Sequence, residues 1–418
     1  PDFPRFDLVV FDEASQIPTW DAIGAVARGE KLIVVGDPKQ LPPTTFFMRL
    51  DDEDVDEDDI EELESILDEA IAVSMPSLRL AWHYRSRHEH LIAFSNHHYY
   101  EGDLFTFPAA DHARPGLGVG WHPVPDGVYD KSRTRTNRAE AEALVADVVR
   151  RLSDPGESVR SIGIVTFSLA QQTLIQDLLD DARRAEPELE RFFSDTVEEP
   201  VFVKNLENVQ GDERDVILFS VCYGPDEKGR VAMNFGPLNR TGGERRLNVA
   251  VTRAREQLVV FSTLTADQID LARTSSVGVA HLKAFLAYAE RGPAALDQAL
   301  PREAAGADPT PVEAGIRAAL EAQDLEVDAR VGCSGYRVDL GVKDPVDPER
   351  YLLGVETDGP MYASGRTTRD RDRTRSEVLG SLGWHLERVW LTEWWQDPAR
   401  EVERITARLR REAEAVAV

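Results

Sequence analysis

Five apolar runs of strand length constrain the fold of this chain more than any other feature. They lack the polar alternation of half-exposed strands, which is typical of strands covered on both faces. Helical stretches such as 138–152 and 169–179 separate them. This order predicts α/β domains built on parallel sheets. The runs are FDLVVF (6–11), KLIVVG (31–36), SIGIVTF (161–167), DVILFSV (215–221) and QLVVFS (257–262).

The 418 residues suggest two to four domains at roughly 100 to 200 residues each. The segment Ala294–Pro311 is rich in Ala, Pro and Asp and is interpreted as a linker. We expect a partial first sheet domain with an acidic insertion (1–76), a complete second one (77–265), a helix and linker (266–310) and a third domain (311–418). The third domain is expected to contain a helix (312–322), strands (326–331, 336–342, 351–357), a basic helix (367–382) and a last strand (384–391).

The chain is strongly acidic, and this limits how it can bind nucleic acid. The net charge of −27 argues against a broad grip on nucleic acid, because such a grip needs Lys and Arg to displace counterions, so any nucleic-acid path is expected to be local. Much of the acid lies in Leu50–Ala70, which predicts an exposed loop leading into an acidic helix; a partner-binding tail is the alternative.

The two cysteines, Cys222 and Cys333, lie far apart and indicate neither a disulfide framework nor a thiolate metal site. No apolar stretch approaches the roughly 20 residues that span a bilayer, and no secretory signal is present. We therefore expect a cytoplasmic protein without a membrane partner. Because the first residue is not Met, we also expect the chain to be part of a longer protein.

Acidic and amide side chains follow the first two apolar runs. Asp12 and Glu13 end the first, and Gln40 follows the second in GDPKQLPPT. The carboxyl ends of parallel strands are where an open sheet presents groups to a ligand. One acid can hold Mg²⁺ while the next orients the water that attacks a γ-phosphate. An acidic pair that only caps a turn is the alternative.

These two strand ends resemble motifs II and III of superfamily 1 helicases related to the nonsense-mediated-decay helicase. Later motifs follow in the family's order: WHYRSRHEHLIAFSNHHYYEGDL (82–104), IVTFSLAQQ (164–172), VQGDERDVILFSV (209–221) and RLNVAVTRAR (246–255). The resemblance implies RecA-like domains, the first partial and the second complete, that use ATP. It places Gly211 near the nucleic acid, Glu213 near the ribose, and Arg253 as an arginine finger beside Arg255. The implied nucleotide site comprises Asp12, Glu13, Gln40, Arg85, Gly211, Glu213, Arg253 and Arg255.

The same resemblance makes Ser168 or Gln171 candidates for contact with the nucleic-acid backbone. The phosphate-gripping loop, G-x-x-x-x-G-K-[ST], does not occur in the chain. Without its Lys and its Mg²⁺-binding hydroxyl, this chain should not hydrolyse ATP alone. We expect the missing amino-terminal motor half to lie in the same parent protein or in a partner chain.

The third domain carries a set of spaced acids. Asp339 and Glu356 lie near the ends of two predicted neighbouring strands with 16 residues between them. Adjacent strands can bring such carboxylates to one Mg²⁺ or Mn²⁺ for phosphodiester cleavage. Asp358 shares a face with Glu356 if the strand continues, and Glu313 can complete the set. Solvated strand-end acids are the alternative.

The spacing D-x16-E-x-D resembles the PD-(D/E)xK nuclease core. Residues 311–396 more closely resemble very-short-patch-repair endonuclease domains, which implies a small α/β restriction-endonuclease-like fold. Two departures put cleavage in doubt: Asp358 replaces the usual Lys, and Ala363 stands where relatives carry His. Arginines of RTTRDRDRTR are candidates to grip phosphates, although ion pairs within the helix account for them equally well. They are Arg366, Arg369 and Arg373.

Trp384, Trp390, Trp394 and Trp395 are expected to pack in the core and at strand ends rather than stack on bases. Together, the resemblances imply the carboxyl-terminal part of an ATP-dependent helicase-nuclease that acts on DNA, with RNA possible, in restriction, defence or repair, and that moves 5′ to 3′. Two alternatives stay open. One is a nucleic-acid-binding or assembly module with a degenerate nuclease, and the other is an RNA helicase with an accessory domain.

Overall fold

The computed structural model describes residues 4–43, 64–83, 85–111, 114, 116–194, 196–297, 308–333, 336–365 and 367–416. The chain forms two compact units. One comprises Pro1–Leu80, His122–Arg253 and Val260–Leu286; the other comprises Ala81–Trp121, Ala254–Val259 and Ala287–Val418. The described strands form three sheets, of two, five and four strands.

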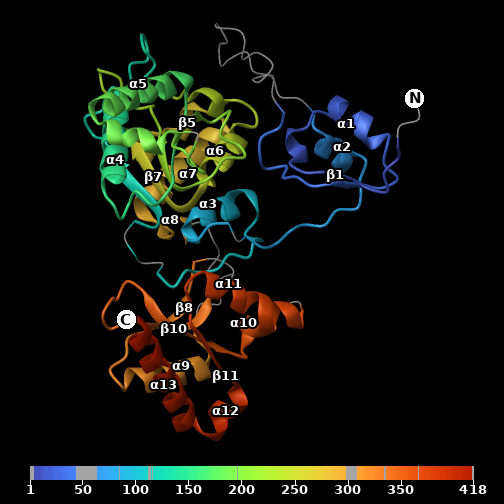
Figure 1. Ribbon diagram of the computed structural model, residues 1–418, viewed down its shortest axis with the longest axis vertical. Helices are drawn as coiled ribbons and strands as arrows, with labels where there is room; N and C mark the ends of the chain where they lie inside the picture. Colours follow the sequence, from blue (N-terminus) through green and yellow to red (C-terminus); the bar gives the residue numbers. More distant parts are fainter. Residues whose placement is uncertain are drawn as a thin grey trace. The chain divides into compact units, whose positions relative to one another are not determined.

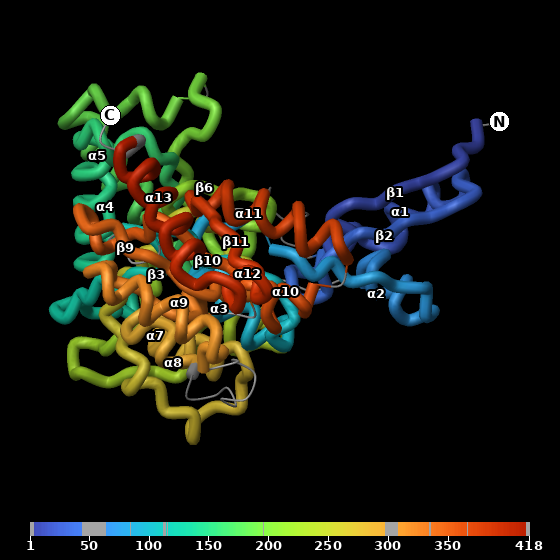
Figure 2. The backbone as a smooth tube through the Cα atoms, turned by 90° about the horizontal axis from the view of Figure 1, so that it is seen from below, coloured from blue at the N-terminus to red at the C-terminus, as the bar shows by residue number. Residues whose placement is uncertain are grey.

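The two-stranded sheet holds the first candidate residues. Strands β1 (Val9–Phe11) and β2 (Leu32–Val34) pair in parallel, with Phe11 opposite Val34. Helix α1 (Thr19–Val26) lies beside them (Figures 1 and 2) and joins α2 (Ile66–Ala72) in a small apolar cluster. A capping box between Ser65 and Asp68 starts α2, because each satisfies the other's backbone amide.

Helix α2 confirms the predicted helix at the end of the acidic run. Residues 44–63, which contain most of that run, lie outside the described residues.

The five-stranded sheet has the order β3-β7-β6-β4-β5, in which β4 pairs in parallel with both β5 and β6. All five residues of β4 are buried, as the uninterrupted apolar run predicts. Helices α4 and α5, side by side in Figure 1, begin at the N-caps Asn137 and Ser168. The strands are β3 (Gly118–Pro123), β4 (Ile162–Thr166), β5 (Phe202–Asn205), β6 (Arg214–Ser220) and β7 (Ala254–Ser262). The helices are α3 (His90–Tyr99), α4 (Arg138–Ser153), α5 (Leu169–Ala185), α6 (Gly243–Val251) and α7 (Val277–Arg291).

The four-stranded sheet has the order β11-β10-β9-β8, antiparallel except for the parallel pair β10–β11. One apolar cluster contains Ile316 of α9 and Ile405 of α13, and a second contains Tyr336 and Trp384. The sheet and its helices comprise α9 (Pro311–Glu321), β8 (Val327–Val331), β9 (Val338–Lys343), β10 (Tyr351–Thr357), α10 (Pro360–Ala363), α11 (Arg375–Ser381), β11 (Leu386–Val389), α12 (Leu391–Gln396) and α13 (Pro398–Val416).

Short 3-10 helices complete the described elements. They are Ala14–Gln16, Pro187–Phe192, Gly236–Asn239, Ala266–Gln268 and Leu271–Arg273. No helix in the described part of the chain is both long and apolar enough to cross a membrane.

The α/β class with a RecA-like parallel sheet and a separate mixed-sheet domain is confirmed. The details differ at two places. The basic helix is a π-helical stretch, Asp370–Thr374, followed by α11. Helix α8 (Ala294–Asp297) occupies the start of the expected linker, and residues 298–307 lie outside the described residues.

The tryptophans divide into two pairs. Trp384 and Trp394 are buried as expected, but Trp390 and Trp395 are 39% and 74% exposed. Trp395 follows Trp394 on one helix, so its side chain points about 100° away from the core.

Candidate nucleotide site and endonuclease-like centre

The first two candidate acids lie at the carboxyl end of β1. Asp12 and Glu13 are exposed, and the Glu13 amide donates to Asp12 Oδ1 over 2.9 Å. Glu13 has a left-handed backbone (φ 49°), a conformation that costs a non-glycine residue about 1 kcal/mol. Such strain is concentrated at functional sites.

Gln40 connects the loop after β2 with two later motifs. Its Oε1 accepts a hydrogen bond from Gln210 Nε2 (3.3 Å), next to Gly211. In the same loop, the carbonyl oxygen of Lys39 accepts from Asn248 Nδ2 of α6 (2.9 Å). Gly211 is exposed and has a φ of 89°, which favours glycine at this turn. Segments more than 160 residues apart in the chain therefore meet at Gln40.

The segment that contains Arg85 lies beside the last motif. The Arg87 amide donates to the Arg255 carbonyl oxygen (2.7 Å), and its guanidinium pairs with Glu256 (2.5 Å). Arg85 itself is exposed. Two candidate arginines, Arg85 and Arg255, are thus carried by segments that hydrogen-bond to each other.

The expected arginine finger is turned inward. Arg253 is 4% exposed, and its Nε and Nη2 donate to Val249 O (2.8 Å) and Thr252 Oγ1 (3.0 Å). These acceptors lie at the end of α6, where a cation is favourable. To reach a γ-phosphate, Arg253 has to leave them. Glu213 is half-buried and lies immediately before β6.

Gln171, a candidate for nucleic-acid contact, is instead fully buried. Its amide donates to the Asn137 carbonyl oxygen (3.1 Å) and to Ser220 Oγ (3.1 Å). It therefore ties the N-terminus of α4 to the end of β6. Ser168 is also mostly buried and accepts from the Gln171 amide as the N-cap of α5.

The end of β6 also lies beside a buried carboxyl group that sequence reasoning missed. Glu140 of α4 accepts hydrogen bonds from Ser220 Oγ (2.6 Å), the Cys222 amide (2.6 Å) and the Thr263 amide (3.2 Å). Burial raises the pKa of Glu140 to about 7, although these donors lower it. The only local signal is the Asn137 N-cap three residues before it.

The endonuclease-like domain brings two of its candidate carboxylates together around an arginine. Arg330 Nη2 lies 2.8 Å from Glu313 Oε2, and Arg330 Nη1 lies 3.0 Å from Asp339 Oδ1. Asp339 Oδ2 accepts from both the amide and the hydroxyl of Thr357, each over 2.9 Å. Burial raises the pKa of Asp339 to about 6, against the lowering effect of Thr357 and Arg330.

The other two candidate acids have separate partners. Glu356 accepts a hydrogen bond from the Tyr336 hydroxyl and lies 3.5 Å from Arg388 Nη2. Strand β10 spans Tyr351–Thr357, as predicted, so Asp358 lies beyond the strand that bears Glu356. Asp358 accepts from the Leu391 amide (2.7 Å) as α12 begins. Burial raises the pKa of Tyr336 well above its usual value, and the Glu356 charge adds to this.

A metal ion does not fit these acids as they are arranged. Within the described ranges, no three His, Cys, Asp or Glu side chains group closely enough to hold an ion. The oxygens of Glu313 and Asp339 already accept from Arg330, Thr310 and Thr357. Arg330 and Thr357 were missed from the sequence. A charged residue inside the predicted strand 326–331 was the available signal.

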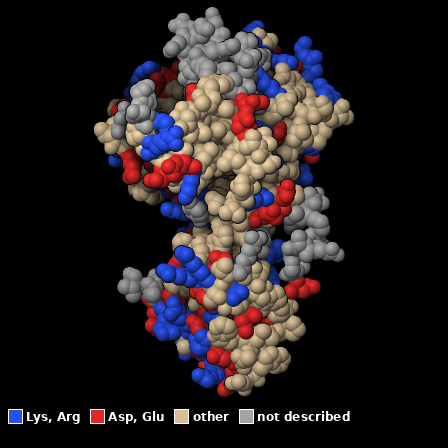
Figure 3. Space-filling view, turned by 90° about the vertical axis from the view of Figure 1, so that its right-hand side faces the viewer, with Lys and Arg blue, Asp and Glu red and all other residues tan. Residues whose placement is uncertain are grey.

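One of the candidate phosphate-binding arginines forms an ion pair within its own helix. Arg373 pairs with Glu377 four residues on (2.8 Å), as the ion-pair interpretation predicts. Arg369 is exposed, and Arg366 lies outside the described residues. On the face shown in Figure 3, basic side chains are interspersed with acidic ones rather than gathered in one field.

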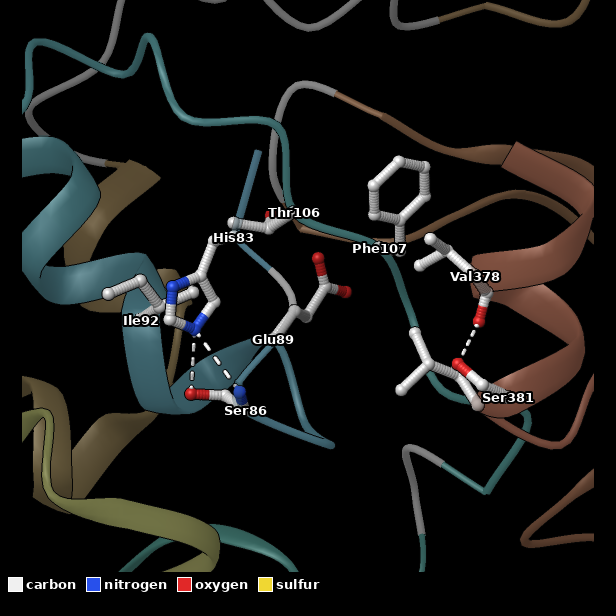
Figure 4. Close-up of a pocket in the computed structure, with 9 residues that line it drawn as sticks. His83, Ser86, Glu89, Ile92, Thr106, Phe107, Val378 and Ser381 are labelled. Carbon is white, nitrogen blue, oxygen red and sulfur yellow. Dashed lines mark hydrogen bonds between the residues drawn. The ribbon is translucent and has the colours of Figure 1, made fainter. Parts of the chain in front are cut away.

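A pocket joins the Arg85 segment to the third domain (Figure 4). It is lined by residues on either side of Arg85, including His83, Ser86 and Glu89, and by Val378 and Ser381 of α11. His83 Nε2 and Ser86 Oγ lie 2.9 Å apart, and Glu89 Oε1 accepts from the Cys333 amide (2.8 Å).

Comparison with known proteins identifies the same two parts. AAA domain families match residues 2–47 and 62–265, and the REase_MTES_1575 family matches residues 313–409. An uncharacterized ATP-dependent helicase of Mycoplasma genitalium is 32% identical over 97% of this chain and 37% of its own length. Human probable helicase senataxin is 27% identical over 62% of this chain and 9% of its own.

A 5′-3′ DNA helicase of Mus musculus is also 27% identical, over 62% of this chain and 13% of its own length. The chain thus spans well under half of the relatives that it matches. Residues 2–265 thus match AAA domain families and are similar to helicases, and residues 313–409 match a restriction-endonuclease-like family.

Proposed function

We propose that residues 1–265 form the carboxyl-terminal part of an ATP-driven DNA motor, to which an endonuclease-like domain is attached. The observation that carries this proposal is the meeting of motifs at one place. Gln40 is bonded to Gln210, and Lys39 to Asn248, beside the strand end that bears Asp12 and Glu13. A nucleotide bound there would be reached from both sides of the motor.

The chemistry of each side chain suggests its role. Asp12 would hold the Mg²⁺ that accompanies ATP, and Glu13 would orient the attacking water. Gln40 and Arg85 contact the γ-phosphate. Arg253 neutralises the charge that spreads over the equatorial oxygens once it leaves the Val249 carbonyl oxygen, with Arg255 beside it. Gly211 and Glu213 approach the nucleic acid and the ribose.

The phosphate-gripping loop, or P-loop, is proposed to come from a segment outside these residues. Support comes from the exposed apolar face of the two-stranded sheet. Val10 and Ile33 are opposite in register and are 54% and 47% exposed. Neighbouring strands and helices normally cover both faces of a parallel sheet. The remainder of the first RecA-like domain, in the same polypeptide or a partner chain, would cover this one.

DNA is the proposed substrate because restriction-type domains act on it, and one relative is named a 5′-3′ DNA helicase. A role in restriction, defence or repair, and 5′ to 3′ movement, belong to the same proposal. In the endonuclease-like domain, Arg369 and Arg373 are proposed to hold phosphates. We assign no cleavage step to Mg²⁺ or Mn²⁺ at Asp339, Glu356 and Glu313, because these acids do not assemble a metal site.

Strand displacement tests the proposal. The complete motor, meaning this chain together with the P-loop segment, is given DNA duplexes with a 5′ or a 3′ single-stranded tail and the matching RNA duplexes. ATP-dependent unwinding of the 5′-tailed DNA, lost in Glu13→Gln, is expected. Unwinding of RNA but not DNA would favour the RNA-helicase alternative. No unwinding of either, with nucleic acid still bound, would leave only a binding module.

A further inference from the structure

Arg330 adopts a backbone conformation that a strand residue rarely takes. It lies in β8 opposite Asp339, between the pairs Ala329–Leu340 and Val331–Val338. Its φ is 58°, in the left-handed region that is unfavourable for an arginine. The surroundings hold this strain, and the result is that the side chain points at two buried carboxylates.

The guanidinium lies between these carboxylates as a bridging cation would. The Arg330 side chain is 8% exposed, while those of Glu313 and Asp339 are 0% and 3% exposed. Its two terminal nitrogens each bind a different carboxylate, and its buried Nε has no hydrogen-bond partner among the described residues. Two buried negative charges without a cation would be costly, and arginine is the residue best suited to a buried pair.

We propose that Arg330 is the built-in cation of the endonuclease-like domain, and that it excludes a divalent metal from the space between Glu313 and Asp339. Three donors enforce this arrangement from outside the pair. The Thr310 amide holds Glu313 Oε2 (2.9 Å), and the amide and hydroxyl of Thr357 hold Asp339 Oδ2 (2.9 Å each). Each oxygen of both carboxylates thus accepts at least one hydrogen bond before any ion arrives. The proposal does not depend on the function of the motor.

Arg330→Gly is the informative variant, because glycine adopts a positive φ without strain and leaves no guanidinium. Mn²⁺ binding is measured on the whole chain from the electron paramagnetic resonance signal of free Mn²⁺. The natural chain and Asp339→Asn should bind the same amount of Mn²⁺, because only surface acids elsewhere in the chain bind it in both. Arg330→Gly should gain one equivalent that binds about 10- to 100-fold more tightly than that background. The double variant Arg330→Gly/Asp339→Asn should lose it.

Arg317→Ala is the matched control, because Arg317 forms an exposed pair with Glu321 on the helix that carries Glu313. It should bind Mn²⁺ as the natural chain does. If Arg330→Gly does not fold by circular dichroism, Arg330→Asn replaces it, since asparagine also tolerates this backbone. The proposal is overturned if the natural chain binds one Mn²⁺ that Asp339→Asn lacks. It is equally overturned if the folded glycine or asparagine variant gains no site.

Discussion

Glu140 shows how one buried residue can make the stability of the motor depend on pH. Its pKa is about 7 in the folded chain and 4.5 for an ordinary glutamate. Unfolding therefore releases a proton between these values, so the contribution of Glu140 to stability is greatest below pH 4.5 and decreases as the pH rises to 7. The decrease is on the order of 3 kcal/mol.

Glu140→Gln should remove this decrease, because an amide has no proton to release. The measurement is the urea concentration at half-unfolding, followed through hydrogen exchange of α4 at pH 5 and pH 8. Glu142→Gln, on the same helix but paired at the surface with Arg138, should keep the natural pH dependence. An unchanged slope in Glu140→Gln would show that Glu140 does not hold the proton.

A buried ion pair joins Arg246, the first residue of RLNVAVTRAR, to Glu207. Arg246 and Glu207 are 1% and 3% exposed, with Nε and Oε1 2.7 Å apart. Arg246→Met should destabilise the domain by roughly 3–5 kcal/mol, since it leaves a buried carboxylate unpaired. Adding Glu207→Gln should recover at least half of the loss. A double variant whose loss equals the sum of the single losses, measured by urea unfolding, would contradict the pairing.

At the scale of elements, the segment before β3 is built into the third domain's core. The Ala110 amide donates to Leu382 O (3.0 Å), Ala110 O accepts from the Tyr351 amide (2.7 Å), and Trp384 Nε1 donates to Pro108 O (2.8 Å). Trp384 also stacks on Tyr351. Trp384→Phe keeps an aromatic ring but leaves the Pro108 carbonyl unpaired, which costs about 1–3 kcal/mol.

Hydrogen exchange of residues 105–110 should therefore be faster in Trp384→Phe. Trp395→Phe is the control, because Trp395 is 74% exposed and should leave exchange unchanged. Equal exchange in the two variants would mean that the Trp384 hydrogen bond does not hold this segment.

Elements with a strong local pattern could be predicted from the sequence, and those without one could not. The apolar runs that became β4, β6 and β7 were predicted because burial on both faces leaves continuous hydrophobic stretches. Strand β5 was missed: FVKN is short and half polar. The long helix α13 was missed because nearly half of its residues are charged; among the described residues, Val402, Ile405 and Leu409 pack in the core.

The candidate sites follow the same rule. Asp339 and Glu313 were predicted as acids of one site and do lie around one guanidinium, but the guanidinium of Arg330 was not foreseen. Its position depends on the strand register and on a left-handed residue within a strand, neither of which has a local sequence signal. The inward rotamer of Arg253 likewise depends on its packing against α6.

At the scale of the whole molecule, the proposed motor and the endonuclease-like domain lie in one acidic chain. A net charge of −27 leaves little general attraction for nucleic acid. Contact with it then depends on local groups placed by the motor and by the arginines after β10. The proposed nucleotide-site acids Asp12 and Glu13 are exposed, whereas the acids of the endonuclease-like centre are paired with Arg330. We therefore propose that ATP hydrolysis in the motor is the main chemistry of the protein.

Single-turnover ATP hydrolysis tests that assignment most directly. This chain alone should release no phosphate above background, and addition of the P-loop segment with DNA should produce hydrolysis. In the complete motor, Arg253→Ala should slow phosphate release by roughly 10³-fold or more, with little change in ATP affinity. Arg184→Ala, an exposed arginine paired with Asp181, should have no effect. A release rate in Arg253→Ala equal to that in Arg184→Ala would contradict the account.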